Sequence, residues 1–230
     1  MNTRLMKSME CSQSNAKGYI FDLDGTLSDT LESLSVSGNL ALGEIGMEPF
    51  PKDRYRYFVG DGADELVRRM LIANGDTECV HYDELRAAYR RTFAEHADYK
   101  VTVYDGMPET LKELKDRGYK LAVLSNKPHK QAVEVVEKLY GAGVFDHIRG
   151  NVREIPRKPS PEGALLTASA IGLDPSEIIY VGDTSTDMKT GKNAGMFTVG
   201  VLWGFRERDE LIENGADIII GHPRDLLEII

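Results

Sequence analysis

Cysteine and long apolar runs are both scarce in this sequence of 230 residues. Its two cysteines, Cys11 and Cys79, lie far apart and support neither a disulfide framework nor a cysteine-rich zinc site. No stretch is apolar for long enough to predict a membrane span, and the opening segment MNTRLMKSMECSQSNAKG lacks the apolar core of a secretory signal. We therefore expect a soluble, cytoplasmic protein without a membrane partner, in which residues 1–17 form a loose N-terminal extension.

Positive charge is also in short supply. The chain has 28 lysines and arginines against 37 aspartates and glutamates, which gives a formal net charge of -9. No nucleic-acid partner is expected, because a phosphate backbone requires clustered positive charge. A small anionic substrate would need a local source of positive charge in its binding site. The oligomeric state, monomer or homodimer, stays open.

The first hundred residues begin with a strand and continue with helices. The apolar run GYIFDL predicts a strand at 18–23, and leucines at helical spacing predict a helix over 26–47. After two prolines, apolar residues three or four apart predict helices at 63–73 and 82–97, with no strand between them. Residues 30–100 are therefore expected to form a helical domain.

Strands and helices alternate in the remainder of the chain. The apolar patterns predict a helix at 108–118, a strand at 120–125, helices at 129–140 and 161–172, a strand at 178–182, a helix at 187–195, strands at 197–202 and 217–220, and a helix at 223–230. Apolar strands separated by helices indicate a parallel sheet covered on both faces. The predicted fold class is α/β: residues 1–29 and 101–230 form a doubly wound parallel sheet, and residues 30–100 are inserted after its first strand.

Polar side chains follow several of the predicted strands or precede a helix. The candidates are Asp22 and Asp24, Ser125 and Asn126, Lys158, and Asp183 and Asp187. Ligands of open parallel sheets bind outside the carboxyl ends of the strands. We therefore expect four separate stretches of the chain to meet at one edge of the sheet.

Each candidate also has an ordinary structural explanation. Asp22 and Asp183 could cap helices, Ser125 could cap the helix that follows it, and most lysines, Lys158 included, are simply solvated. Against this, Asp22 and Asp24 are two residues apart, which directs both carboxylates to the same side of an extended chain. It is the ordered combination of these residues that indicates a functional site.

Four motifs occur in the order DLDGT, SN, KPSP and GDTSTD, from the first strand to the last third of the chain. In this order they resemble the motifs of haloacid dehalogenase (HAD) superfamily phosphatases. The segments YFVGDGADELVRRM and GVLWGF resemble the phosphoglycolate phosphatase branch of that superfamily. The resemblance implies a HAD-like core, with the helical insert serving as its cap domain.

The resemblance also assigns roles to the candidate residues. Asp22 would attack phosphorus and form an aspartyl-phosphate, which divides a difficult hydrolysis into two steps. Asp24 would protonate the leaving oxygen and then take a proton from the incoming water. Lys158 would place a positive charge beside Asp22 and the phosphoryl group.

A magnesium ion and a phosphate-binding shell complete the implied site. Mg²⁺ prefers oxygen ligands, which Asp22, the backbone carbonyl of Asp24 and Asp183 would supply, with Asp187 behind them or bridged by water. Gly25, Thr26, Ser125 and Asn126 would bind the phosphoryl oxygens. In the cap, a loop of Gly60, Asp61 and Gly62 would face the substrate and help select it; its ordinary explanation is a turn before a helix.

The predicted function is therefore Mg²⁺-dependent hydrolysis of a small phosphate ester, with phosphoglycolate phosphatase as the model. Four alternatives stay open. A sugar phosphomutase of the beta-phosphoglucomutase kind or a phosphonate hydrolase would share the core motifs. Another phosphatase of the superfamily, such as a pyrophosphatase or nucleotidase, would also fit. A receiver-like phosphoacceptor module uses an aspartate at a strand end as well, although it has no need of Asp24.

Overall fold

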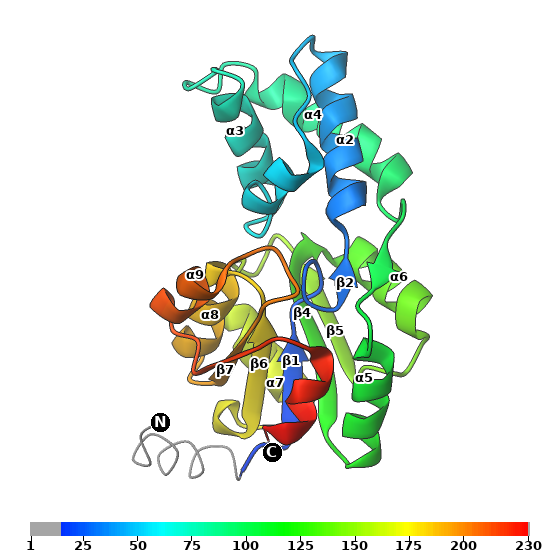
Figure 1. Cartoon of the computed structure of the whole chain (residues 1–230), viewed down its shortest axis with the longest axis vertical. Helices are drawn as coiled ribbons and strands as arrows, with labels where there is room; N and C mark the ends of the chain where they lie inside the picture. The colour runs from blue at the N-terminus through cyan, green and yellow to red at the C-terminus, as the bar shows by residue number, and fades with distance from the viewer. Residues whose placement is uncertain (1–14, 230) are drawn as a thin grey trace. The chain divides into compact units, whose positions relative to one another are not determined.

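The computed structural model describes residues 15–229, so Cys11 and most of the proposed N-terminal extension lie outside the described part. The chain divides into two compact units, drawn in Figure 1. The first contains the described residues up to Leu27 and those from Val103 onward, and the second is Ser28–Thr102. Within residues 15–229, no helix is both long and apolar enough to cross a membrane.

A six-stranded parallel sheet organises the first unit, with the order β5-β4-β1-β6-β7-β8. The strands are β1 (Gly18–Phe21), β4 (Lys120–Pro128), β5 (His147–Asn151), β6 (Ile178–Gly182), β7 (Phe197–Val201) and β8 (Ile218–Ile220). All four residues of the inner strand β1 are buried, as its continuous apolar sequence requires. The neighbours β4 and β6 are parallel to it, so the three carboxyl ends meet at one edge.

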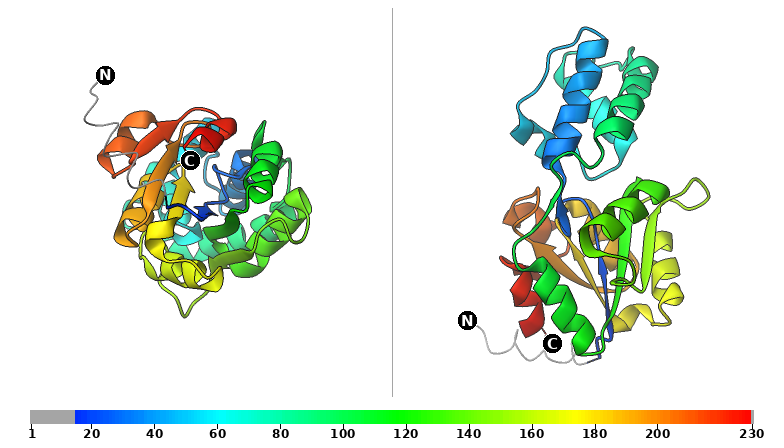
Figure 2. Two further views of the ribbon diagram at one scale, coloured as in Figure 1. Left: turned by 90° about the horizontal axis from the view of Figure 1, so that it is seen from below. Right: turned by 90° about the vertical axis from the view of Figure 1, so that its right-hand side faces the viewer.

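Helices cover both faces of this sheet, as Figure 2 shows. The unit contains α5 (Met107–Asp116), α6 (His129–Tyr140), α7 (Glu162–Ala170), α8 (Ser185–Asn193), α9 (Arg208–Glu213) and the 3-10 helices η2 (Pro175–Glu177) and η3 (Pro223–Glu228). The side chains of successive β1 residues pack on opposite faces of the sheet. Phe21 contacts Phe145, which in turn contacts Tyr140 of α6, whereas Ile20 joins a cluster with Ala164 and Ala168 of α7. The prediction of a doubly wound α/β sheet is confirmed.

The second unit is built from α2 (Leu31–Glu44), the 3-10 helix η1 (Lys52–Tyr57), α3 (Ala63–Ala73) and α4 (Tyr82–His96). Helix α2 packs against both α4 and η1. Gly38 permits this close approach, because a Cβ atom there would lie 2.4 Å from the hydroxyl oxygen of Tyr55. Tyr55, in η1, also donates a hydrogen bond to Asn39 of α2, which joins these two helices.

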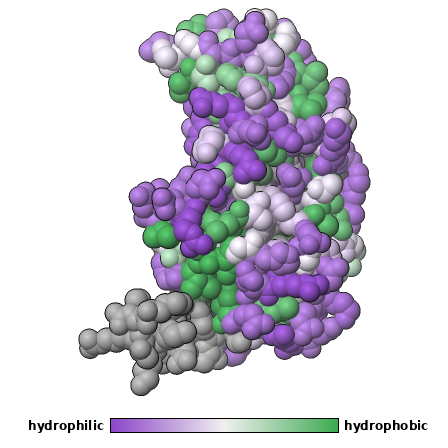
Figure 3. All heavy atoms as spheres, viewed as in Figure 1, coloured by the Kyte–Doolittle hydropathy of each residue, from purple (hydrophilic) through white to green (hydrophobic). Residues whose placement is uncertain are grey.

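The strands β2 (Ser28–Asp29) and β3 (Thr102–Val103) pair where the chain enters and leaves this insert. The predicted helix over 26–47 was therefore wrong at its start, because residues 28–29 are extended and the helix begins at Leu31. Hydrophilic residues predominate on the face of the molecule seen in Figure 3, in agreement with the charged composition.

Candidate active site

Asp22 lies directly after β1, in the loop that leaves the carboxyl edge of the sheet. Its backbone N–H donates to the carbonyl of Val181 at 2.9 Å, which continues the pairing of β1 with β6 and fixes the position of the residue. Its side chain is buried, and the Lys158 ammonium lies 2.7 Å from its Oδ1 atom. The predicted nucleophile and the predicted cation are therefore in direct contact.

Asp183 follows β6, the neighbour of β1, and is fully buried. The hydroxyl of Thr26 donates to its Oδ1 at 2.9 Å, and the backbone N–H of Phe205 donates to its Oδ2 at 2.8 Å. Glycines permit this confinement: a Cβ atom at Gly25 or Gly204 would lie 2.3 Å from an Asp183 atom. The carboxylate is thus held by two separate segments of the chain, residues 25–26 and 204–205.

Asp187 lies in the first turn of α8 and is also fully buried. Its Oδ1 accepts from the Lys158 ammonium at 2.8 Å and from the Tyr180 hydroxyl at 3.5 Å. Its Oδ2 accepts from the backbone N–H of Thr184 at 3.1 Å and from the Thr184 hydroxyl at 2.6 Å. Two donors to each oxygen leave little capacity for a metal ion, so the contacts favour a role in holding Lys158.

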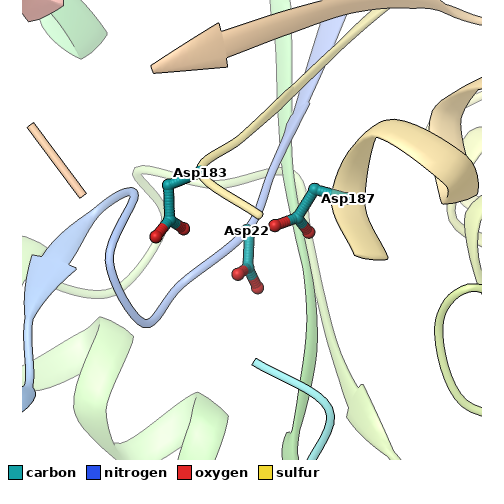
Figure 4. A group of neighbouring side chains, drawn as sticks. All are labelled: Asp22, Asp183 and Asp187. Atoms are coloured by element: carbon teal, nitrogen blue, oxygen red, sulfur yellow. The ribbon is translucent and has the colours of Figure 1, made fainter. Parts of the chain in front are cut away.

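The carboxylates of Asp22, Asp183 and Asp187 form one buried cluster, shown in Figure 4, in which an oxygen of each lies within 4.8 Å of the others. Burial, followed by the charge of Asp187, raises the pKa of Asp22 well above its ordinary value. The same two causes raise the pKa of Asp183 to about 7. Buried oxygen donors that repel one another in this way fit a hard divalent cation such as Mg²⁺.

Lys158 is the cation that the structure itself places in this cluster. Burial alone would lower the pKa of its ammonium group, but the charges of Asp187 and Asp22 outweigh that effect and raise the pKa well above the ordinary value. Lys158 therefore remains charged at neutral pH, in contact with both carboxylates. This arrangement suits a group that must attract a phosphoryl oxygen beside the nucleophile.

Lys127 is a site residue that the sequence analysis missed. Its ammonium lies 2.9 Å from Oδ1 and 3.2 Å from Oδ2 of Asp24, so it bonds both oxygens of the proposed acid and base. The sequence contained one usable signal, since Lys127 directly follows Ser125 and Asn126 in the SN motif. Lys127 was not selected from the sequence because most lysines are exposed to solvent.

The side chains expected to bind phosphate have protein partners in the structure. The hydroxyl of Ser125 accepts the backbone N–H of Lys127 at 3.1 Å. The amide of Asn126 accepts the backbone N–H of Lys158 at 3.0 Å and donates to its carbonyl at 3.2 Å, which ties the end of β4 to the lysine-bearing loop. Thr26 donates its hydroxyl to Asp183, as described above. Their direct contact with phosphate stays a prediction, and the backbone N–H groups of this region are the other candidates.

The loop at Gly60, Asp61 and Gly62 belongs to the second unit and precedes α3. Both glycines have positive φ angles, 112° and 87°, which favour glycine. Asp61 forms an ion pair with Arg69 of α3, and Arg69 also donates to the carbonyl of Phe58 at 3.2 Å. The negative charge expected on this loop is therefore neutralised by a neighbouring arginine.

Comparisons with known proteins agree with this geometry. Residues 19–201 match the family model described as haloacid dehalogenase-like hydrolase. The chain is 32% identical to the phosphoglycolate phosphatase of Aquifex aeolicus, with 91% of this chain and 94% of that protein covered. It is 31% identical to the N-acetylmuramic acid 6-phosphate phosphatase of Pseudomonas aeruginosa, with 93% and 94% covered. The crystal structure of a candidate phosphoglycolate phosphatase from Lactobacillus delbrueckii subsp. bulgaricus has a TM-score of 0.88 at 29% identity, with 93% and 98% covered.

Proposed function

The chain belongs to the haloacid dehalogenase-like hydrolase family, and from this membership we propose that it is a Mg²⁺-dependent phosphomonoester hydrolase. One observation carries the proposal. The buried carboxylate of Asp22 has the Lys158 ammonium 2.7 Å away and the carboxylate of Asp183 beside it, at the carboxyl edge of the sheet. This combination provides a nucleophile, a fixed cation and oxygen ligands for a metal at one point.

The proposed reaction has two steps, both on Asp22. In the first, a carboxylate oxygen of Asp22 bonds to phosphorus, the ester P–O bond breaks, and Asp24 gives a proton to the leaving oxygen. In the second, Asp24 takes a proton from a water molecule that attacks the aspartyl-phosphate. Inorganic phosphate leaves and both aspartates return to their starting states. Lys158 stays charged throughout and attracts the phosphoryl oxygens.

We assign the metal ligands to Asp22, Asp183 and the backbone carbonyl of Asp24. Bound there, Mg²⁺ would offset the negative charge of the carboxylates and of the phosphoryl group. The charge balance supports this assignment: when Asp22, Asp24, Asp183 and Asp187 are all ionised, they carry two more negative charges than Lys127 and Lys158 can balance.

For the substrate class, we propose a small phosphomonoester that carries a carboxylate, with phosphoglycolate as the first candidate. The two curated relatives described above are named for phosphate esters of glycolate and of N-acetylmuramic acid, which are both carboxylic acids. The loop at residues 60–62, in which Arg69 offsets the charge of Asp61, is the proposed selecting element of the second unit. A neutral loop imposes less repulsion on an anionic substrate than a loop with an unpaired aspartate would.

A panel of phosphomonoesters, assayed with Mg²⁺ by release of free phosphate, tests the function directly. We expect many turnovers per enzyme molecule, which a phosphoacceptor module that is modified only once would not give. Product analysis separates a hydrolase from a mutase, because a mutase returns an isomerised sugar phosphate. Absence of phosphate release from every ester in the panel would overturn the proposal.

No lysine occurs between Asp53 and Cys79, so a phosphonate hydrolase with a Schiff-base lysine in that segment has no support.

A further inference from the structure

Lys127 has no task in the mechanism described above, although it lies beside one of its central groups. We propose that Lys127 is a positioning residue for the Asp24 carboxyl group. Its ammonium holds one oxygen of the protonated group, which leaves the other oxygen to give its proton to the leaving oxygen, and it holds both oxygens of the ionised group that results. The inference rests on the proposed function, because Asp24 acts as an acid only if the enzyme cleaves phosphate esters. It concerns the orientation of a side chain and is independent of which ester is the substrate.

The geometry of the contact is the first support. The Lys127 ammonium lies 2.9 Å and 3.2 Å from the two oxygens of Asp24. A contact with one oxygen would let the carboxylate turn about its last bond, whereas a contact with both restricts that rotation. Proton transfer requires the donor oxygen within hydrogen-bond distance of the leaving oxygen, so a fixed carboxylate is an advantage.

The difference in exposure between the two side chains is the second support. The Lys127 side chain is 2% exposed, while that of Asp24 is 21% exposed. Asp24 therefore presents part of its carboxylate to an incoming molecule, and Lys127 does not. A buried ammonium is costly unless it is paired. The structure therefore assigns Lys127 an effect that acts through Asp24.

The placement of Lys127 on the sheet is the third support. It lies near the end of β4, the strand that pairs with β1 in the sheet. Its N–H donates to the hydroxyl of Ser125, and its neighbour Asn126 bonds the backbone of Lys158. The end of β4 thus positions Lys127 beside Asp24. It also positions the loop that carries Lys158, which lies beside Asp22.

The test compares two leaving groups in the variant Lys127→Met, which keeps the length of the side chain and removes its charge. Glycerol phosphate releases an alkoxide that needs a proton, and 4-nitrophenyl phosphate releases a stable phenolate that does not. The quantity measured is kcat/KM, which depends only on steps up to the first cleavage and excludes the later attack of water. We expect a loss of about 10-fold to 100-fold for glycerol phosphate and of less than about 3-fold for 4-nitrophenyl phosphate.

Three further variants separate positioning from a general structural effect. Asp24→Asn should show the same leaving-group pattern with a larger loss, and adding Lys127→Met to it should cost little more, because both changes remove one shared function. The matched control is Lys130→Met, since Lys130 lies on α6 and is 88% exposed. We expect this control to leave both substrates unaffected.

The outcomes distinguish failure of the positioning role from failure of the proposed function. If the unaltered protein releases no phosphate from any ester of the panel, these two included, the proposed function fails and the inference fails with it. If the unaltered protein is active and Lys127→Met lowers kcat/KM equally for both esters, the function stands and the positioning role is rejected. Circular dichroism checks folding. If Lys127→Met does not fold, Lys127→Arg replaces it, since this variant keeps the charge but changes the head group. The ratio of kcat/KM for the two esters is then measured in the same way.

Discussion

At the scale of single residues, the proposed mechanism depends most on Asp22 as the nucleophile. Asp22→Asn should lower kcat by about a thousandfold or more, because an amide is a far poorer nucleophile than a carboxylate. The melting temperature of the metal-free variant should equal or exceed that of the unaltered protein, since the substitution removes a buried charge that its neighbours repel. Initial rates and thermal melts measure the two effects.

The control for this substitution is Asp116→Asn. Asp116 is an exposed residue at the end of α5, paired with Lys112 on the same helix. The same chemical change there should leave both kcat and the melting temperature unchanged. Turnover near the unaltered level in purified Asp22→Asn would disprove the nucleophile assignment.

As a proposed metal ligand, Asp183 should make metal binding sensitive to pH. Its pKa in the metal-free protein is raised from the ordinary value of 3.8 to about 7, so the folded state holds a proton there that Mg²⁺ must displace. Mg²⁺ affinity should therefore fall as the pH falls through about 7, by about tenfold per unit when a single proton competes. Isothermal titration with Mg²⁺ between pH 6 and pH 8 measures this. An affinity that stays constant over that range would show that the proton and the metal do not compete at Asp183.

The same shift has a consequence for stability without metal. Because the folded-state pKa of Asp183 lies above its ordinary value, the folded state binds this proton more tightly than the unfolded state does. The contribution of Asp183 to stability is therefore lost as the pH rises from about 4 to about 7. In the variant Asp183→Asn this part of the pH dependence should disappear, and equilibrium unfolding of the two metal-free proteins at several pH values compares them.

The sequence indicated the positions of some of these residues and gave no sign of the contacts that others make. Asp22, Asp183 and Lys158 could be chosen because they follow strands or motifs whose order is visible in the sequence. The partner of Lys127 could not, since Asp24 is 103 residues away and the pairing of β1 with β4 brings them together. The partners of Thr26 and Asn126 likewise depend on loops that only the folded sheet brings into contact.

At the scale of elements, the predictions succeeded where an apolar pattern was strong. The helices α3 and α6 and the strand β6 have the predicted ends. The strand β5 was missed because its sequence, HIRGN, is largely polar and it lies at the edge of the sheet. The helix α9 was missed because six residues give too short a pattern, and residues 223–228 form a 3-10 helix where an α-helix was expected.

The loop at residues 60–62 and helix α3 give the prediction that belongs to this scale. Asp61→Asn removes a negative charge from the loop and leaves Arg69 in place beside the carbonyl of Phe58. The proposed selecting role requires the loop to lie near the substrate; at a separation of about 6 Å, a charge change of one unit is worth about 1 kcal/mol after solvent screening, or about fivefold in specificity. We therefore expect kcat/KM for phosphoglycolate to rise several-fold relative to that for glycerol phosphate.

The matched control for the loop is Asp64→Asn. Asp64 is also in this unit and is paired with Arg86 of α4 at 2.7 Å, so the substitution changes the charge of the unit equally but leaves loop 60–62 intact. The ratio of the two substrates should stay constant in this variant. A constant ratio in Asp61→Asn as well would show that the charge of the loop does not reach the substrate.

At the scale of the whole molecule, the division into two units allows the effect of the metal to be located. Asp22 and Asp183 both belong to the unit that contains the sheet, whereas Ser28–Thr102 contributes none of the three clustered carboxylates. When two units unfold independently, a ligand stabilises the unit that binds it, by an amount that grows with the ligand concentration. Mg²⁺ should therefore stabilise the sheet unit, and a calorimetric scan in which the units melt separately should show one shifted transition.

The size of this shift in melting temperature can be predicted, and a salt control separates its specific part from general screening. At one hundred times its dissociation constant, a metal adds about 2.7 kcal/mol, which raises the melting temperature of a domain of this size by about 5 to 10 °C. The protein carries a net charge of -9, so part of any shift could come from general screening. Sodium chloride at equal ionic strength measures that part, and we expect it to be the smaller one. Asp183→Asn should lose the specific part while keeping the salt effect, because one ligand is missing and the overall charge hardly changes. An equal response of Asp183→Asn and the unaltered protein to Mg²⁺ would place the metal elsewhere than in this cluster.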